Sequence, residues 1–456
     1  MSSFSTKILS KNSIINLLFS SLIVSFIAGN LVLNLNVLLI IVASIIFYKE
    51  EIFIIDFDLF DKILIFLFVY ILICGLVNSL NYYRSEFDND FTVLKKSIFF
   101  LRFLIFFFII KFLIKKNIIN FKFFFYISSA GVIFVCADII YQLIFGYDIF
   151  GYDIDPDPKK AAGRRLSGPF GDELIAGSFI QRFSLISLFS VTIFFKFKKS
   201  YVKYFLTMSL ILLFITSLVL SGNRIPLIFF VITIICLIIF ENNLRKFLIP
   251  FILIVFTIIF SIYNLNNDVR NHFHGFSKKL VQILLPLSKK HLLTNEEEEE
   301  YKNYQFYTFE YNGKKYKITN SHLKEFKTGY VTWLDKKIFG GGVKSFKINC
   351  PKAKTINCSS HPHNYYLEIL SSLGLFGFMI IFILFILLFL RSFVTKYFKN
   401  SHLNNFNLIT PFIFLFFAEI FPIKSTGSFF STGNATYIFL ILSILISLIQ
   451  YKNKIE

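Results

Sequence analysis

The sequence predicts an all-α integral membrane protein with about twelve transmembrane helices and one long loop between the ninth and tenth helices. Of its 456 residues, 55% are hydrophobic and 19% are aromatic, whereas a soluble domain averages about 45–50% apolar residues. The apolar residues form long runs without charges, such as 103–110, 209–220, 251–262 and 379–390. A helix built from such a run is apolar on every face, which suits lipid rather than water.

The apolar runs define the expected spans and divide the chain into three regions. We expect spans at 13–29, 31–48, 61–79, 97–113, 123–145, 174–195, 203–220, 226–240, 247–264, 366–390, 407–423 and 433–450. Residues 1–264 therefore hold nine helices, residues 265–365 form the loop region, and residues 366–456 hold three helices.

The basic residues of the short loops predict the orientation, because cytoplasmic loops are enriched in lysine and arginine. With the N-terminus in the cytoplasm, the cytoplasmic turns and tail carry Lys111, Lys115, Lys116, Lys122, Lys196, Lys198, Lys199, Lys203, Arg245, Lys246, Arg391, Lys396, Lys399, Lys452 and Lys454. The opposite short turns hold fewer. Both termini are then cytoplasmic and the loop region is periplasmic. The net charge of +19 fits this pattern and a surface that attracts anionic lipid or phosphate. Nucleic acid is excluded as a partner, because the basic residues are scattered between spans and form no nucleic-acid-binding motif.

Two of the five cysteines, Cys350 and Cys358, lie in the polar loop. In a periplasmic loop they can form a disulfide worth about 2–3 kcal/mol, whereas in a cytoplasmic loop they would be free thiols. The orientation favours the disulfide.

Three further observations concern the rest of the sequence. The acidic run 296–300 fits a solvated face, and the glycines 340–342 predict a turn. No cluster of metal-ligating residues is visible in the sequence.

Charged and polar residues at the edges of spans are expensive and therefore informative. On the predicted outer side they are Asp138, Arg224, His361, His363, Asn364, Glu368, Glu419 and Lys424. Their position on one side favours a site open to the periplasm over a proton path across the membrane.

His363 and Asn364 stand where the loop re-enters the membrane. A neutral imidazole can take a proton from a sugar hydroxyl, because its pKa lies near neutral pH. Asn364 can hold the ring or bind a substrate hydroxyl. The alternative is structural: Asn364 caps the helix that follows, and His363 is solvated beside it.

Arg224 ends the sequence Ser-Gly-Asn-Arg between two spans. Its planar guanidinium suits a diphosphate, and Arg165 can supply a second phosphate contact. The alternative is an arginine that reaches lipid headgroups. Asp138, inside its span, is either a supporting residue of the site or paired structurally with a nearby hydroxyl or cation.

Together these features resemble the O-antigen ligase/polymerase family of bacterial membrane glycosyltransferases. The architecture is similar over most of the chain, and three motifs carry the resemblance. They are Ser-Gly-Asn-Arg ending at Arg224, the stretch from Trp333 to Phe346 with Phe-Gly-Gly-Gly at 339–342, and His363-Asn-Tyr-Tyr-Leu-Glu followed by Leu-Gly-Leu-Phe-Gly. Many members have an arginine shortly before the loop tryptophan. This chain has none there, and Lys327, Lys324 or His322 stands in that stretch instead.

The resemblance implies a bacterial inner-membrane enzyme that moves a glycan from undecaprenyl diphosphate to an acceptor hydroxyl on the periplasmic side. It makes His363 the catalytic base and Arg224 a binding residue for the diphosphate. From the sequence itself we add Arg165 and Lys327 as further diphosphate contacts, and Asn364, Glu368 and Asp138 as supporting residues. The mechanism would invert the anomeric centre and need no metal or other cofactor. The acceptor is a lipid A-core, a glycan or a protein, so a ligase and a polymerase both remain open.

Two functions from other classes compete with this interpretation. A transporter or flippase for an anionic solute or lipid-linked glycan predicts broken helices at the midplane and symmetric halves, which the sequence does not display. A non-catalytic assembly protein predicts that His363 and Arg224 are freely replaceable.

Overall fold

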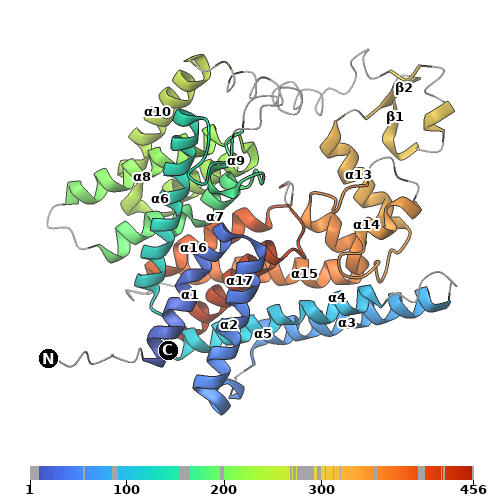
Figure 1. The fold of residues 1–456 in the computed structure, drawn as a ribbon, viewed down its shortest axis with the longest axis horizontal. Helices are drawn as coiled ribbons and strands as arrows, with labels where there is room; N and C mark the ends of the chain where they lie inside the picture. Colours follow the sequence, from blue (N-terminus) through green and yellow to red (C-terminus); the bar gives the residue numbers. More distant parts are fainter. Residues whose placement is uncertain are drawn as a thin grey trace.

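The structure, a computed structural model (Figure 1), describes residues 10–54, 57–84, 91–153, 165–195 and 200–265, and most of 292–453. Between 266 and 291 it describes residues 267, 270 and 274. Shorter gaps fall at 295–298, 303–304, 312, 319, 354, 356–357, 399–405, 423 and 425–426. The acidic run 296–300 thus lies mostly outside the described residues.

Helices make up nearly all of the regular structure. The α-helices are α1 Lys11–Ala28, α2 Asn30–Tyr48, α3 Leu59–Arg84, α4 Thr92–Phe100, α5 Arg102–Lys115, α6 Phe121–Phe145, α7 Ala176–Phe189, α8 Ser200–Leu220, α9 Arg224–Phe240, α10 Asn242–Leu265, α13 Ser321–Leu334, α14 Phe346–Asn349, α15 Tyr365–Tyr397, α16 Phe406–Ile420 and α17 Thr432–Asn453. A π-helix at Ser190–Phe194 extends α7.

The predicted all-α membrane fold is confirmed. Within the described residues, nine helical segments are at least 18 residues long and apolar enough to cross a membrane, and α9 and residues 408–420 of α16 are apolar but shorter. Each of the twelve expected stretches coincides with a helix. The expected span 97–113 comprises two helices, α4 and α5, which meet at Leu101.

Contacts between helix ends define two opposite faces of the bundle. At one end, here the terminal face, Lys116 pairs with Glu51 at 3.0 Å. On the same face Glu241 accepts from Tyr397 at 3.0 Å. The other end, here the loop face, carries the starts of α9 and α15. This grouping of helix ends agrees with the predicted alternation of loops.

Lys111 corrects one detail of the charge pattern. The charge pattern predicts a cytoplasmic loop cation at this position, but the side chain is buried and pairs with the buried carboxylate of Asp61. Lys111 therefore forms a buried ion pair inside the bundle and is not a solvent-exposed charge of the loop.

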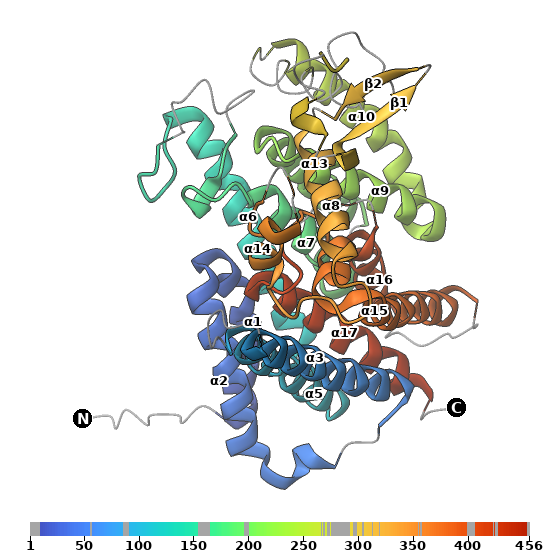
Figure 2. The same cartoon turned by 90° about the vertical axis from the view of Figure 1, so that its right-hand side faces the viewer.

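The loop region contains a β-hairpin and a helix that the sequence analysis did not predict. Strands β1 Thr308–Tyr311 and β2 Lys314–Lys317 pair antiparallel, with Thr308 opposite Lys317. The Asn-Gly sequence at 312–313 is typical of a two-residue hairpin turn, and Gly313 has a φ of +68°. The hairpin lies next to α13 in both views (Figures 1 and 2).

The glycines at 340–342 insert into a break in α15, an arrangement here called the glycine clamp. Gly374 interrupts α15 with a φ of +69°. The amides of Gly341 and Gly342 donate to the carbonyls of Ser371 and Ser372 at 2.9 and 2.7 Å. The loop thereby satisfies backbone groups that the break leaves open.

Both sides of the clamp require glycine. A Cβ on Gly340 would lie 2.4 Å from a backbone atom of Ser372, and a Cβ on Gly374 would lie 1.9 Å from the carbonyl oxygen of Ile338. Two of the motifs quoted above, 339–342 and 373–377, are therefore the two halves of one contact.

Candidate functional site at the loop face

His363 lies two residues before α15 and faces a carboxylate. Its Nε2 is 3.6 Å from Oε1 of Glu325 in α13, and a third of its side chain is exposed. The separation is that of an ion pair rather than a hydrogen bond. His363 has a φ of +53°, a conformation that non-glycine residues adopt at a cost and that occurs often at functional sites.

A close contact between α13 and the segment before α15 brings Glu325 to His363. A Cβ on Gly329 would lie 2.7 Å from Pro362, so glycine at this position lets α13 approach the Pro-His dipeptide. Glu325 is four residues earlier and lies on the same face of α13. Its other oxygen is 3.2 Å from Nδ1 of His322.

The surroundings of His363 favour its neutral form. Burial lowers the pKa of His363, His322 lowers it further, and Glu325 acts in the opposite direction. For Glu325 burial would raise the pKa, but the hydrogen bond from His322 and the charges of the three histidines outweigh it and lower the pKa. A neutral imidazole beside an ionised carboxylate can take up a proton, and the carboxylate then stabilises the imidazolium.

Asn364 and Glu368 anchor the start of α15. Asn364 caps the helix, since its Oδ1 accepts from the amide of Leu367 at 3.1 Å, and its Nδ2 donates to the carbonyls of Pro422 and Lys424. The carboxylate of Glu368 accepts from Ser428 and from the amide of Phe429. The structure thus gives Asn364 the capping role, and both residues fix the segment between α16 and α17 to α15.

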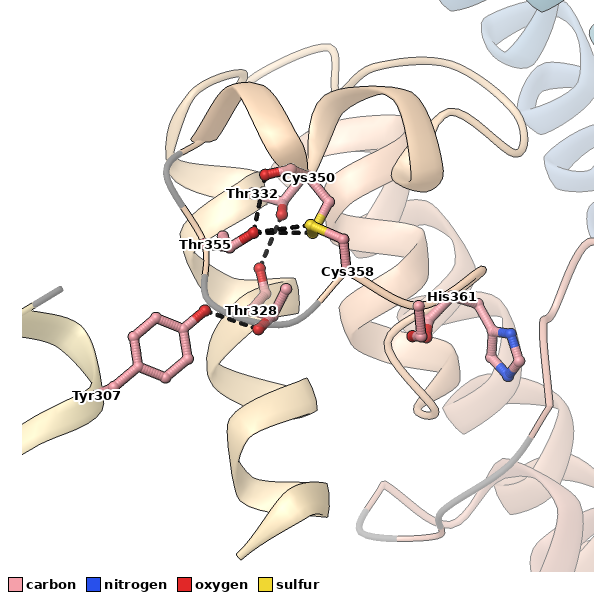
Figure 3. Close-up of a disulfide and its surroundings, with 8 residues drawn as sticks. Tyr307, Thr328, Thr332, Cys350, Thr355, Cys358 and His361 are labelled. Carbon is pink, nitrogen blue, oxygen red and sulfur yellow. Dashed lines mark hydrogen bonds between the residues drawn. A yellow bond between two sulfur atoms is a disulfide. The ribbon is translucent and has the colours of Figure 1, made fainter. Parts of the chain in front are cut away.

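A disulfide between Cys350 and Cys358 tethers the chain that leads to His361 and His363. Figure 3 shows it beside Thr328 and Thr332 of α13. Thr355 donates to the carbonyl of Cys350 at 2.8 Å. The disulfide therefore constrains the chain just before the segment that packs against α13 at Gly329.

Arg224 occupies the first position of α9, after the turn that contains Gly222 with a φ of +65°. The turn packs on α7, because a Cβ on Gly177 would lie 2.5 Å from Asn223. Arg165 lies close enough to act on Arg224 electrostatically. Two guanidinium groups at this range repel one another, and an anion between them would relieve the repulsion.

A cavity of about 640 Å³ opens beside this turn. Its charged lining residues are the cations Arg182 and Lys424 and the carboxylates Asp172 and Glu173. Apolar side chains of α1, α2, α7 and α9 also line it. The cavity thus combines apolar surface with charged groups of both signs.

The two cations of the cavity wall share one buried carboxylate. Arg182 donates to both oxygens of Glu419, at 2.5 and 3.3 Å, and Lys424 donates to the second of them at 2.7 Å. Arg182 also donates to the hydroxyl of Tyr365 at 3.0 Å and to Oδ1 of Asn434 at 2.7 Å. These five residues form the network here called the Arg182 network, which joins α7, α15, α16 and α17.

Two other predicted residues, Asp138 and Lys327, have described contacts that do not include His363. Asp138 accepts from the amide of Ile149 at 2.8 Å, so its partner is a backbone amide of the loop after α6 rather than a hydroxyl or a cation. Lys327 lies on α13, and its ammonium is 6.0 Å from the ring centre of Tyr330.

Sequence reasoning missed Arg182 and Glu325, for different reasons. Arg182 falls inside the expected span 174–195, and a charge within a span is itself a signal that could have identified it. Glu325 has no comparable signal, because it lies in a polar segment and only the packing of α13 on Pro362 brings it to His363.

Comparison with known families identifies one match. Residues 208–382 match the O-Antigen ligase family, and this stretch includes Arg224, Glu325 and His363. The resemblance found in the sequence motifs is thereby confirmed. No curated protein matches the chain.

Proposed function

Because residues 208–382 of this membrane protein match the O-Antigen ligase family, we propose that it transfers a glycan from undecaprenyl diphosphate to an acceptor hydroxyl at the periplasmic face. The observation that carries the proposal is the pairing of His363 with Glu325 inside the matched region. It provides a partly exposed base at the point where the loop region meets the bundle.

The proposed reaction is a single displacement. The acceptor hydroxyl gives its proton to His363 as its oxygen bonds to the anomeric carbon, and the bond from that carbon to the diphosphate oxygen breaks. Glu325 is a positioning residue that stabilises the imidazolium. The configuration at the anomeric carbon inverts, because one displacement occurs.

Arg224 and Arg165 are proposed to hold the diphosphate. Their mutual repulsion in the unliganded protein favours an anion between them, and guanidinium groups bind phosphate oxygens in pairs. The two cations can neutralise the charge that develops on the leaving group, so this reaction requires no metal. Lys327 of α13 is proposed as a further contact with the diphosphate.

The cavity suits an amphiphilic donor. Its volume of about 640 Å³ is within the range of small-ligand sites. We propose that the apolar wall takes the first isoprene units, with the diphosphate at the start of α9.

The proposed orientation puts the loop face in the periplasm. A reporter active only in the periplasm should therefore work when fused near Asn320. Activity of a cytoplasmic reporter at that position would overturn the orientation and the site together.

The function itself is tested by the intermediate that a deletion strain accumulates. Loss of the protein should cause glycan linked to undecaprenyl diphosphate to accumulate. Single repeat units would indicate a polymerase, and full-length chains would indicate a ligase. Normal glycan transfer in the deletion strain would contradict both and favour a transport or assembly role.

A further inference from the structure

Two buried carboxylates outside the Arg182 network meet at the end of α6. Asp138 lies on α6 and is 3% exposed, and Asp148 lies in the loop that follows and is fully buried. Oδ1 of Asp138 accepts from the amide of Ile149 at 2.8 Å, so the residue next to Asp148 is docked on it. The two carboxylates are close enough to act on one another electrostatically. They are called here the α6 carboxylate pair.

Each carboxylate of the pair has one oxygen in use and one left over. Oδ1 of Asp148 accepts from the amides of Phe150 and Tyr152 at 2.9 and 2.8 Å, and Oδ1 of Asp138 accepts from Ile149. The Oδ2 atoms of both aspartates are buried and have no hydrogen-bond partner among the described residues. The pair therefore offers two buried oxygen atoms to a ligand.

A cation suits these two oxygens better than a proton does. A protonated carboxyl group is a hydrogen-bond donor, yet neither Oδ2 meets an acceptor in the part of the chain that the structure describes. Two ionised carboxylates at close range repel one another, and burial makes the repulsion larger. A positive ion between them removes it, and carboxylate oxygens are preferred ligands of Ca²⁺ and Mg²⁺.

The pair holds a loop that forms part of the proposed donor cavity. Tyr152, at the end of that loop, lines the cavity together with Gly171. The ring of Tyr152 packs on Gly171, since a Cβ there would lie 3.5 Å from it. One turn further along α6, Oε1 of Gln142 accepts from the amide of Gly168 at 3.0 Å. One face of α6 therefore holds both segments that form this wall.

We propose that the α6 carboxylate pair binds a hard divalent cation, Ca²⁺ or Mg²⁺, to which Asp138 and Asp148 each give one oxygen. The ion is structural: it joins α6 to the loop 146–153 and takes no part in the transfer chemistry. Water and backbone oxygens complete its shell, as is common for both ions. The site itself is independent of the proposed function. Its effect rests on that function, because the bound ion fixes Tyr152 at the donor cavity and so favours donor binding.

Binding of radioactive Ca²⁺ to the purified protein in neutral phosphatidylcholine nanodiscs tests the site without any glycan transfer. Protein stripped with a chelator and returned to about 1 mM Ca²⁺, where extracellular calcium modules fill, should bind one ion per chain. Asp148→Asn keeps the oxygen that accepts from the two amides but removes the charge, so it should bind Ca²⁺ at least about tenfold more weakly. The matched control is Asp153→Asn, which removes an exposed charge from the same loop and should bind like the wild type.

Thermal unfolding gives a second readout with an unusual sign. Without divalent ions, Asp148→Asn should be at least as stable as the wild type, because it removes the repulsion within the pair. Added Ca²⁺ or Mg²⁺ should raise the Tm of the wild type and leave that of Asp148→Asn unchanged. An aspartate that serves only its backbone contacts would give the variant the same response to the ions as the wild type, which would contradict the proposal.

Three further results would overturn the proposal. They are a wild type that binds neither Ca²⁺ nor Mg²⁺, equal binding by wild type and Asp148→Asn, or an equal rise in Tm from KCl at the same ionic strength. The first would assign the two oxygens to a proton or to a basic side chain of 154–164. In a transfer assay, chelation should raise the KM for the donor in the wild type and not in Asp148→Asn. A wild-type protein that binds the ion but transfers no glycan would refute the proposed function and leave the cation site standing.

Discussion

Two arginines beside the same cavity have opposite surroundings. Arg182 lies in the Arg182 network, in which it shares the carboxylate of Glu419 with Lys424 and also donates to Tyr365 and Asn434. Arg224 begins α9, and a second cation, Arg165, lies close enough to act on it electrostatically. Both lie in a bundle of apolar helices, where an uncompensated charge is expensive.

The comparison distinguishes buried ion pairs that join helices from cations that we propose to bind an anionic ligand. In the Arg182 network one carboxylate pairs with two cations, and in the pair of Lys111 with Asp61 one carboxylate pairs with one cation, so both groups join helices through buried ion pairs. Arg165 and Arg224 instead bring two cations close together, and we propose that a bound diphosphate lies between them. Substitutions should therefore affect stability in the first kind of group and binding or transfer in the second.

The largest expected effect is on transfer, from His363→Ala. Loss of a general base typically slows a reaction about a hundred- to ten-thousand-fold, and His363 is partly exposed, so the amount of folded protein should stay normal. A complementation assay with matched expression would measure transfer. His361→Ala is the control and should retain it; near wild-type transfer by His363→Ala would instead favour a structural role.

The second prediction concerns stability. Glu419→Gln leaves two buried cations without a counter-charge, which should cost about 3–5 kcal/mol and sharply reduce the folded protein recovered from membranes. Thermal unfolding in detergent, followed by size-exclusion chromatography, would measure this. Glu173→Gln, at the exposed rim of the same cavity, should have little effect. A stable Glu419→Gln protein would break the distinction drawn here.

A third prediction concerns the carrier. Arg224→Lys keeps the positive charge but removes the planar fork, so it should weaken binding of undecaprenyl diphosphate roughly tenfold without loss of stability. Equilibrium binding in nanodiscs would measure it. The matched control is Arg245→Lys on the terminal face, where the side chain donates to carbonyls of Ile238 and Ile239. Equal affinities for the carrier in Arg224→Lys and wild type would indicate that Arg224 only anchors the helix end.

The smallest effect should be a shift in pH dependence. Transfer requires neutral His363, so it should fall as the pH drops through the pKa of this residue, which burial places below the ordinary value for histidine. Glu325→Gln removes a charge that raises this pKa, so the acid limb should move to lower pH. His322→Ala removes a neighbour that lowers it and should move the limb the other way. Identical pH profiles in all three proteins would separate Glu325 from the chemistry.

The sequence and the structure agree best where one residue type dominates a long stretch. All twelve apolar runs became helices, because burial of apolar surface in lipid depends on composition over many residues. The break at Gly374 was not predicted, since it depends on backbone donors and acceptors that 337–342 supply from a distant part of the chain. The hairpin at 308–317 was also missed, although its Asn-Gly turn was visible.

The sequence by itself determined the membrane class, the family resemblance, and His363 and Arg224 as candidate residues. These depend on local composition and on short motifs, which a linear chain displays directly. Only the tertiary structure decided which charges are compensated. Glu325 meets His363 because Gly329 lets α13 approach Pro362, and Glu419 neutralises Arg182 across 237 positions of sequence. Partners so distant are chosen by packing, which no local pattern encodes.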